Sequence, residues 1–326
     1  ATEPETLVPL QLVRDTGQVF LLGDHFQLGP LVLSSLAVRL GKLDESMIER
    51  LANERFRAAQ SGTANDPLSR DALTASESRG LFFLTESFRS HPAIMDIYSK
   101  VFYSSQLEHR EREVQQRLMP FFDLQGCSSP VIMHNVQGTE RCDADSASFY
   151  NLDEVKIVQR YVLKLLAVAD VELEPKDIGI ITPYARQVQM LQEQLNACGR
   201  DLSEVEIGTV EHFQGQERAV IILSAVRSST RTQELAEGAR RPIGFLSDPR
   251  RLNVAVSRAV AGLVIVGDLQ HLARYSAEWK EIVRMGQERG HFRGDPMWDE
   301  VTESSMPLSA VPQEQASAAW SALTAE

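Results

Sequence analysis

The sequence predicts an α/β fold, in which a parallel sheet carries helices on both faces. Short aliphatic runs, among them residues 178–181 (IGII) and 263–266 (LVIV), have the length and composition of buried strands. Stretches with apolar residues at helical spacing separate these runs. Apolar strands that alternate with helices are typical of parallel sheets, because helices then cover both faces. With 326 residues, 43% of them apolar, the chain can bury a sizeable core.

The individual elements follow from the same patterns. Strands are expected at the apolar runs, in chain order residues 19–22 (VFLL), 81–84 (LFFL), 131–133 (VIM), 178–181, 220–223 (VIIL) and 263–266. Helices are expected over residues 153–168, where Val155, Val158 and Val162 share one face, and over residues 184–195. The charged run at residues 108–113 (EHRERE) is expected to be a solvated helix face.

Composition excludes several classes of protein. A formal net charge of −12 argues against a protein that wraps duplex DNA, although it leaves room for a narrow basic groove. The three cysteines form no CxxC pair, so neither a zinc site nor a disulfide framework is expected, and no metal site is assigned. A reduced, cytoplasmic location fits this cysteine usage best. No apolar run has the length of a membrane span and the N-terminus has no signal-peptide pattern, so no membrane partner is expected. Because the first residue is Ala1 rather than Met, we expect a piece of a longer protein or the product of a partial gene model.

Polar and glycine-rich clusters lie at the ends of the predicted strands. They are, in chain order, residues 23–30 (GDHFQLGP), 86–92 (ESFRSHP), 182–184 (TPY), 209–217 (TVEHFQGQE) and 248–259 (DPRRLNVAVSRA). Ligands of parallel α/β sheets bind where the strands end. We therefore expect these clusters to gather at one edge of the sheet.

This set of clusters resembles the second half of the superfamily 1B helicases, the group that includes the nonsense-mediated-decay helicase and the Armitage-type RNA-silencing helicases. The clusters at residues 23–30, 88–92, 209–217 and 248–259 look like that family's motifs III, IV, V and VI, in the family's order. The opening ATEPETLVPL resembles the segment after the family's DEAG box. Residues 131–155, with HNVQGTE and SFYNLDEV, look most similar to the Armitage type, which favours RNA as the nucleic acid.

The resemblance implies a RecA-like sheet of the P-loop NTPase type and a division of the chain. Residues 1–60 would be the C-terminal remnant of a first RecA-like lobe, and residues 61–80 a flexible linker. Residues 81–295 would form the second RecA-like helicase domain, and residues 296–326 a disordered tail. A polar loop is expected at residues 228–242, between two of the motifs.

The resemblance assigns catalytic roles to three residues. Arg258 and Arg89 would be arginine fingers, which stabilise the negative charge that builds on the γ-phosphate during phosphoryl transfer. The alternative is that they are surface arginines paired with Asp248 or Glu86. Gln27 would sense the γ-phosphate by donating to a phosphate oxygen and accepting from the attacking water. Its alternative is a loop amide, with Asp24 merely capping the turn.

Further residues would complete the ATP site. Phe88 stands where the family usually has tyrosine and would stack on adenine, which needs a π-face rather than a hydroxyl; alternatively it is a core residue. Gly215 would let the backbone approach the nucleotide closely, and Glu217 would accept from a ribose hydroxyl or a metal-bound water. The alternative for this pair is a turn before a strand, with a solvated carboxylate.

A third group of residues would bind the sugar-phosphate backbone of RNA. The resemblance places there Thr182, Pro183, Tyr184, Thr209 and His212, because hydroxyls and backbone N–H groups contact phosphates without recognising bases. Tyr184 could instead be core, and His212 could simply pack. Either Arg250 or Arg251 is expected to brace motif VI on a carboxylate. The chain departs from the family at Val260 and Ala185, where relatives often have basic residues.

Two family motifs are missing from this sequence. It holds neither a GxxxxGK[ST] phosphate loop nor a DEAG box, which normally supply the lysine, the magnesium ligands and the catalytic glutamate. ATP and Mg²⁺ are therefore expected to be held mainly by a first lobe, and the chain alone should not hydrolyse ATP. The expected partners are single-stranded RNA, that first lobe and RNA-silencing or decay factors.

Three hypotheses remain open at this point. The first is part of an ATP-dependent 5′–3′ RNA helicase. The second is a DNA helicase of the same superfamily, which a preference for DNA in binding assays would favour. The third is a non-catalytic binding or scaffold protein derived from a helicase. A phosphate loop encoded upstream and in frame would favour the first two.

Overall fold

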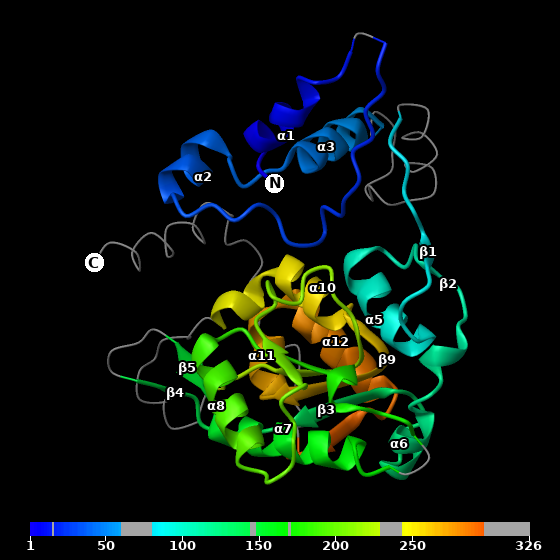
Figure 1. The fold of residues 1–326 in the computed structure, drawn as a ribbon, viewed down its shortest axis with the longest axis vertical. Helices are drawn as coiled ribbons and strands as arrows, with labels where there is room; N and C mark the ends of the chain where they lie inside the picture. Colours follow the sequence, from blue (N-terminus) through cyan, green and yellow to red (C-terminus); the bar gives the residue numbers. More distant parts are fainter. Residues whose placement is uncertain (15, 60–79, 144–147, 169–170, 229–242, 297–326) are drawn as a thin grey trace, which may run out of the picture. The chain divides into compact units, whose positions relative to one another are not determined.

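The computed structural model describes residues 1–14, 16–59, 80–143, 148–168, 171–228 and 243–296 (Figure 1). These residues fall into two compact units. The first comprises residues 1–23 and 29–51, and the second comprises residues 24–28 and 52–296. The predicted linker at 61–80, the loop at 228–242 and the tail at 296–326 lie almost entirely outside the described residues. The predicted domain boundaries therefore stay predictions.

The first unit is helical in its described part. It contains α1 (Glu3–Leu10), α2 (Ser35–Gly41) and the beginning of α3 (Met47–Ala59). Arg50 of α3 forms an ion pair with Glu3 of α1 at 2.6 Å. The strand predicted at residues 19–22 is wrong, because this stretch is irregular and exposes Phe20 and Leu22. The described part of the unit offers this run no strand with which to pair.

The second unit is built on a six-stranded parallel sheet. In spatial order its strands are β10 (Phe292–Gly294), β3 (Val131–Asn135), β9 (Ala259–Gly267), β8 (Arg218–Ser224), β6 (Ile178–Ile181) and β7 (Glu206–Gly208). β9 is buried along its whole length, and β6 likewise. The predicted α/β fold with a parallel sheet is confirmed, as are the strands at 131–133, 178–181, 220–223 and 263–266.

Helices cover both faces of this sheet (Figure 1). One face carries α6 (Met119–Leu124), α7 (Leu152–Leu165) and α8 (Ala185–Asn196), which bury Phe122, Val158 and Leu191 against Ile180 and Ile222. The other face carries α5 (Pro92–Phe102), α10 (Pro249–Val256), α11 (Leu269–Tyr275) and α12 (Ala277–Glu288). The predicted helices at 153–168 and 184–195 correspond to α7 and α8.

Short elements join these layers. β1 (Glu86–Ser87) pairs in parallel with β2 (Glu108–His109), and β4 (Arg141–Cys142) pairs antiparallel with β5 (Phe149–Tyr150). Three-residue or four-residue 3-10 helices lie at Glu113–Gln115, Pro175–Asp177 and Gly244–Ser247. The charged run at residues 108–113 is largely exposed, but the predicted helix is wrong, since it begins as β2. The strand predicted at residues 81–84 is irregular.

Across the described ranges, no helix combines the length and the apolar character that a bilayer crossing requires.

Candidate functional site

The candidate residues lie at two opposite edges of the main sheet. Glu217 and Arg258 come directly before β8 and β9, so they lie at the edge where strands begin, which we call the amino edge. Thr182 follows β6, at the edge where strands end, which we call the carboxyl edge. The prediction that all clusters gather at one edge is therefore wrong. A motif before a parallel strand and a motif after one are separated by the length of that strand.

Arg258 is held almost completely inside the protein at the amino edge. Its side chain is 2% exposed, although it carries a charge. The guanidinium donates to the carbonyl of Val254 at 3.2 Å, to the carbonyl of Gln216 at 3.4 Å and to the hydroxyl of Ser257 at 2.9 Å. Burial lowers the pKa of Arg258 to about 10, and the nearby charge of Arg89 adds to this shift. The group is still a cation at neutral pH, with its orientation fixed.

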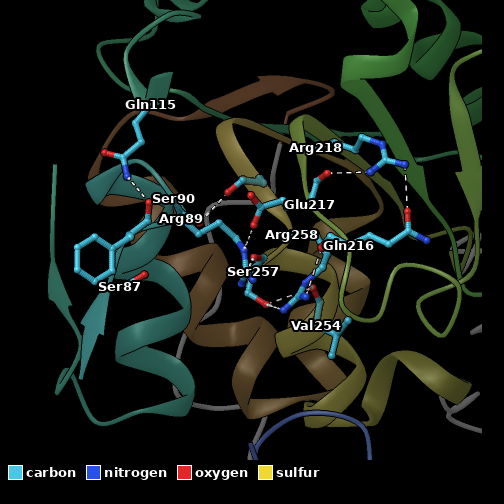
Figure 2. Close-up of polar contacts among 12 residues, drawn as sticks. Ser87, Arg89, Ser90, Gln115, Gln216, Glu217, Arg218, Val254, Ser257 and Arg258 are labelled. Atoms are coloured by element: carbon cyan, nitrogen blue, oxygen red, sulfur yellow. Dashed lines mark hydrogen bonds and ion pairs between the residues drawn. The ribbon is translucent and has the colours of Figure 1, made fainter. Parts of the chain in front are cut away.

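Arg89 approaches the same place from the segment between β1 and α5. Figure 2 shows both arginines directed at Ser257, whose carbonyl accepts from Arg89 at 3.4 Å. The segment is anchored to the start of β9, because the Ser90 hydroxyl donates to the Ala259 carbonyl at 2.7 Å. The next residue continues this anchoring through a backbone hydrogen bond from the His91 N–H to the Val260 carbonyl at 2.8 Å.

Arg89 forms an ion pair with Glu217, at 2.6 Å from Nε to Oε2. The alternative from the sequence is that Arg89 pairs with Asp248 or Glu86. In the structure, Asp248 pairs with Arg251 and Glu86 pairs with Arg110. The Glu217 side chain is half exposed, so a ligand can reach this ion pair and take the place of Arg89 or of Glu217 in it.

Gly215 and Phe88 border the arginines. Gly215 has a φ of +78°, and a Cβ atom placed there would have open space around it, so its role in the turn is conformational. Phe88 is 52% exposed, which makes the core alternative wrong. Its backbone is held by Gln115, whose side-chain amide donates to the Phe88 carbonyl at 3.2 Å (Figure 2). An exposed aromatic ring therefore lies in sequence next to Arg89.

Gln27 belongs to the same compact unit and contacts Arg258 directly. Its Oε1 accepts from Arg258 Nη2 at 3.2 Å, and its Nε2 donates to Asp24 Oδ2 at 2.7 Å. Asp24 also caps the turn, as expected, because Oδ1 accepts from the Phe26 N–H at 3.0 Å. The structure thus brings together the three residues predicted to be catalytic.

At the carboxyl edge, Thr182 and Tyr184 are both buried. Thr182 is 0% exposed, and among the described residues its hydroxyl has no hydrogen-bond partner. Its backbone N–H donates to the Gly208 carbonyl at 3.1 Å. The core alternative is confirmed for Tyr184, whose ring packs against Phe149 and whose hydroxyl accepts from Arg227 at 3.3 Å. Tyr184 therefore positions Arg227 rather than presenting its own ring.

The remaining RNA candidates are spread over a wider area. Pro183 borders a cavity of about 140 Å³, together with Val210, Glu211, Leu223, Leu246, Arg251, Leu252 and Ala255. Thr209 is partly buried after β7. His212 is exposed and contacts Glu206 at the beginning of β7. Pro183 and Thr209 thus lie near Thr182 in the loops that follow the paired strands β6 and β7, whereas His212 contacts Glu206 of β7.

Arg251 is the brace that sequence analysis left unassigned. Its guanidinium pairs with Glu211 at 2.8 Å and with Asp248 at 3.3 Å. Burial of Glu211 by itself would raise the pKa of that carboxyl, but the hydrogen bond from Arg251 and the other bonds that it accepts leave the pKa below its ordinary value. The pair ties the start of α10 to the loop that follows β7.

Sequence analysis missed a buried polar network beneath the carboxyl edge. Glu140 and Arg227 form an ion pair at 2.8 Å with side chains 5% and 7% exposed. Glu154 of α7 is completely buried and accepts from the Ser224 hydroxyl at 2.6 Å and from the Val226 N–H at 2.9 Å. Val226 has a φ of +70°, a strained conformation for a β-branched residue, so this network holds the segment after β8 in a conformation that it would not adopt alone.

One signal in the sequence could have indicated part of this network. Asn151 is the N-cap of α7, and its side chain accepts from the N–H groups of Asp153 and Glu154. An Asn followed three residues later by Glu before an apolar helix is a capping pattern. Here, however, the glutamate turns inward to Ser224 and Val226, which only the packing of α7 on β8 determines.

Two arginines are directed at Ser257 on one edge of the parallel sheet, and loops that carry hydroxyl groups lie at the other, as expected for the helicase class that the motifs resemble. In the described part of the chain, His, Cys, Asp and Glu side chains form no group of three or more that could hold a metal ion.

Comparisons with known proteins agree with this class. The model of the AAA domain family matches residues 44–270. The chain is 37% identical over 276 residues to the RNA helicase Mov10l1 of Mus musculus, covering 84% of the chain and 22% of that protein. It is 34% identical over 328 residues to MOV-10 of Gallus gallus, covering 93% of the chain and 32% of that protein. It is 34% identical over 293 residues to the regulator of nonsense transcripts 1 homolog of Drosophila melanogaster, covering 89% and 22%.

The chain therefore belongs to this AAA domain family, among the superfamily 1 helicases of the nonsense-transcript-regulator type. The armi protein of Drosophila melanogaster, at 35% identity over 298 residues, is among its relatives, as the resemblance to the Armitage type predicts. The chain spans about a third or less of the length of these relatives.

Proposed function

We propose that this chain is the second motor lobe of an ATP-dependent 5′–3′ RNA helicase and supplies two arginines to ATP hydrolysis. The observation that carries the proposal is Arg258, a cation that is 2% exposed and is fixed by two backbone carbonyls, one hydroxyl and the Gln27 amide. Keeping a charge in this position is unfavourable unless it is compensated. A γ-phosphate presented to this edge would compensate it.

The chemistry asked of Arg258 is electrostatic. Negative charge spreads over the γ-phosphate oxygens during transfer, and a donor that is already oriented stabilises it without reorganising. Arg258 is oriented by its backbone partners. Arg89 is less constrained and is paired with Glu217, so it can exchange the carboxylate for phosphate when nucleotide binds.

The surrounding side chains fit a nucleotide. Phe88 offers an exposed ring on which adenine can stack, and Glu217 offers a carboxylate beside the arginines. Mg²⁺ and the phosphate-loop lysine are assigned to a separate first lobe, since this sequence contains no GxxxxGK[ST] motif. The chain by itself should therefore not turn ATP over.

RNA would bind at the carboxyl edge. Thr182 has a buried hydroxyl that lacks a partner in the described chain, and Pro183 and Thr209 belong to the same loops after β6 and β7. Such groups bind phosphates irrespective of sequence, which suits a motor that must move along any strand. Relatives named as RNA helicases favour RNA over DNA. Tighter binding of DNA than of RNA of the same sequence would contradict this part of the proposal.

The test is ATP turnover by a full-length protein that contains this chain. Arg258→Ala and Arg89→Ala should each reduce kcat by roughly a thousandfold, the lower end of the effect of an arginine finger. Arg284→Ala is the matched control, because Arg284 lies on α12 and forms surface ion pairs with Glu281 and Glu288 of the same helix. If the double variant at Arg258 and Arg89 kept normal turnover, the proposed function would be wrong.

A further inference from the structure

Helix α5 ends beside the candidate ATP site with a tyrosine that belongs to none of the family motifs. Tyr103 is the C-cap residue of α5, and its ring packs against Phe26 and Tyr98. From its hydrogen bonds we propose that Tyr103, supported by Asn253, is a positioning residue that sets the orientation of the Gln27 carboxamide. This inference rests on the proposed function and adds a residue to that site.

The contacts form a continuous chain between α10 and Gln27. Asn253 of α10 donates through Nδ2 to the Tyr103 hydroxyl at 2.8 Å and to the Phe26 carbonyl at 2.9 Å. The Tyr103 hydroxyl in turn donates to Asp24 Oδ2 at 2.6 Å. That oxygen also accepts from Gln27 Nε2 at 2.7 Å. Tyr103 thus contacts the carboxylate that holds Gln27, and its hydroxyl also interacts with Gln27 itself.

The chain determines which end of the Gln27 amide faces Arg258. A carboxamide has a donor end and an acceptor end, and a rotation of 180° exchanges them. Asp24 can only accept, so it takes Nε2, while Arg258 can only donate, so it takes Oε1 at 3.2 Å. Both partners require the same orientation. If the Asp24 carboxylate turned away, the amide would lose the acceptor that fixes its donor end.

Burial keeps this chain of hydrogen bonds in one protonation state. Desolvation raises the pKa of the Tyr103 hydroxyl, and the charge of Asp24 raises it further. The tyrosine is therefore a hydrogen-bond donor across the whole neutral range. Its consequence for catalysis is specific, because Gln27 is the group proposed to donate to the γ-phosphate and accept from the attacking water. A misoriented amide would slow the chemical step more than it would weaken ATP binding.

Tyr103→Phe removes one hydroxyl and keeps the ring that packs on Phe26. In the full-length protein it should lower kcat roughly ten- to a hundredfold, the effect of losing a hydrogen bond to a charged group, with KM for ATP changed less than about threefold. Tyr98→Phe is the matched control. It removes from the same helix a hydroxyl that lies 3.3 Å from the Ser87 hydroxyl, and it should leave both constants within about twofold.

A double-mutant cycle separates positioning from general destabilisation. If Tyr103 acts through Gln27, Tyr103→Phe should lower kcat when it is the only substitution. In a protein that already carries Gln27→Ala, it should lower kcat no further. An equal loss in both backgrounds, or an effect no larger than that of Tyr98→Phe, would overturn the inference. Arg258→Ala is measured beside them. Normal turnover by that variant would refute the proposed function itself, whereas loss of turnover there with an inert Tyr103→Phe would refute only this inference.

Discussion

Replacing Glu154 with glutamine should remove a pH-dependent loss of stability from this protein. Glu154 is completely buried and receives its hydrogen bonds from Ser224, Val226 and Asn151. Burial raises the pKa of its carboxyl to about 8, and the charge of Asp268 adds to this shift. The folded protein therefore holds a proton that the unfolded chain, with a pKa of 4.5 at this residue, releases far more readily.

The direction and size of the effect follow from linkage. A carboxyl whose pKa is raised by folding contributes its full stability below pH 4.5, and this contribution is lost as the pH rises through about 8. At about 1.4 kcal/mol per unit, the loss between pH 4.5 and 7 is about 3 kcal/mol. Since domains of this kind are stable by about 5–15 kcal/mol, the effect is large enough to measure.

The assay is urea unfolding of the wild type, Glu154→Gln and Glu193→Gln at pH 5, 7 and 8.5. Glu193 is an exposed carboxyl on α8, so its variant is the matched control. The glutamine amide would oppose the Asn151 amide, which lies 3.4 Å from Glu154 Oε1, and therefore the slopes with pH are compared rather than the absolute values. The free energy of unfolding should fall with pH more steeply in the wild type and Glu193→Gln than in Glu154→Gln. Parallel slopes for all three proteins would refute the assignment.

Three further predictions concern the two edges of the sheet. Thr182→Val should weaken binding of fluorescein-labelled oligouridine in an anisotropy titration without lowering thermal stability, because the lost hydroxyl has no partner in the described chain; unchanged affinity would remove Thr182 from the RNA site. Arg227→Met should lower the free energy of unfolding by about 3–5 kcal/mol in urea, since it removes the cation that is paired with the buried Glu140 carboxylate, and adding Glu140→Leu should restore most of the loss. A double variant as unstable as the single one would contradict that explanation. Phe88→Ala should raise KM for ATP in the full-length protein several-fold, while Phe88→Tyr should keep it; equal effects of both would argue against stacking.

The buried strands could be predicted because their signal is local. Residues 220–223 and 263–266 are continuous aliphatic runs, and each became the centre of a buried strand. Residues 19–22 have the same character and form no strand, since pairing depends on a neighbour that composition does not reveal. β7 and β10 were not predicted. Each has three residues and includes a glycine and a charged residue, so only its register with β6 or β3 makes it a strand.

The residues of the candidate site could be predicted from the sequence, but their arrangement in space could not. The motif resemblance selected Gln27, Arg89 and Arg258, which the structure brings together. Their edge could have been predicted as well, because residues 248–259 precede their strand rather than follow it. Tyr103 carried no such signal, since its partners at residues 24 and 253 are far from it in sequence and meet it only through the packing of α5 on α10.

The separation of the two edges has a mechanical consequence. β8 begins directly after Glu217 and ends just before the Val226–Arg227 segment, so one strand joins the arginines to the proposed RNA edge across about 20 Å, at about 3.3 Å per residue. β9 runs beside it and is buried throughout. Close-packed strands neither stretch nor bend easily, so a displacement at one edge is transmitted to the other as movement of the whole sheet. On the proposed function, we infer that a nucleotide would change how this lobe binds RNA by moving the sheet as a rigid body. Conservative changes inside β8 and β9 should leave the coupling intact, whereas changes at Gln27, or at Tyr103 that positions it, should weaken it.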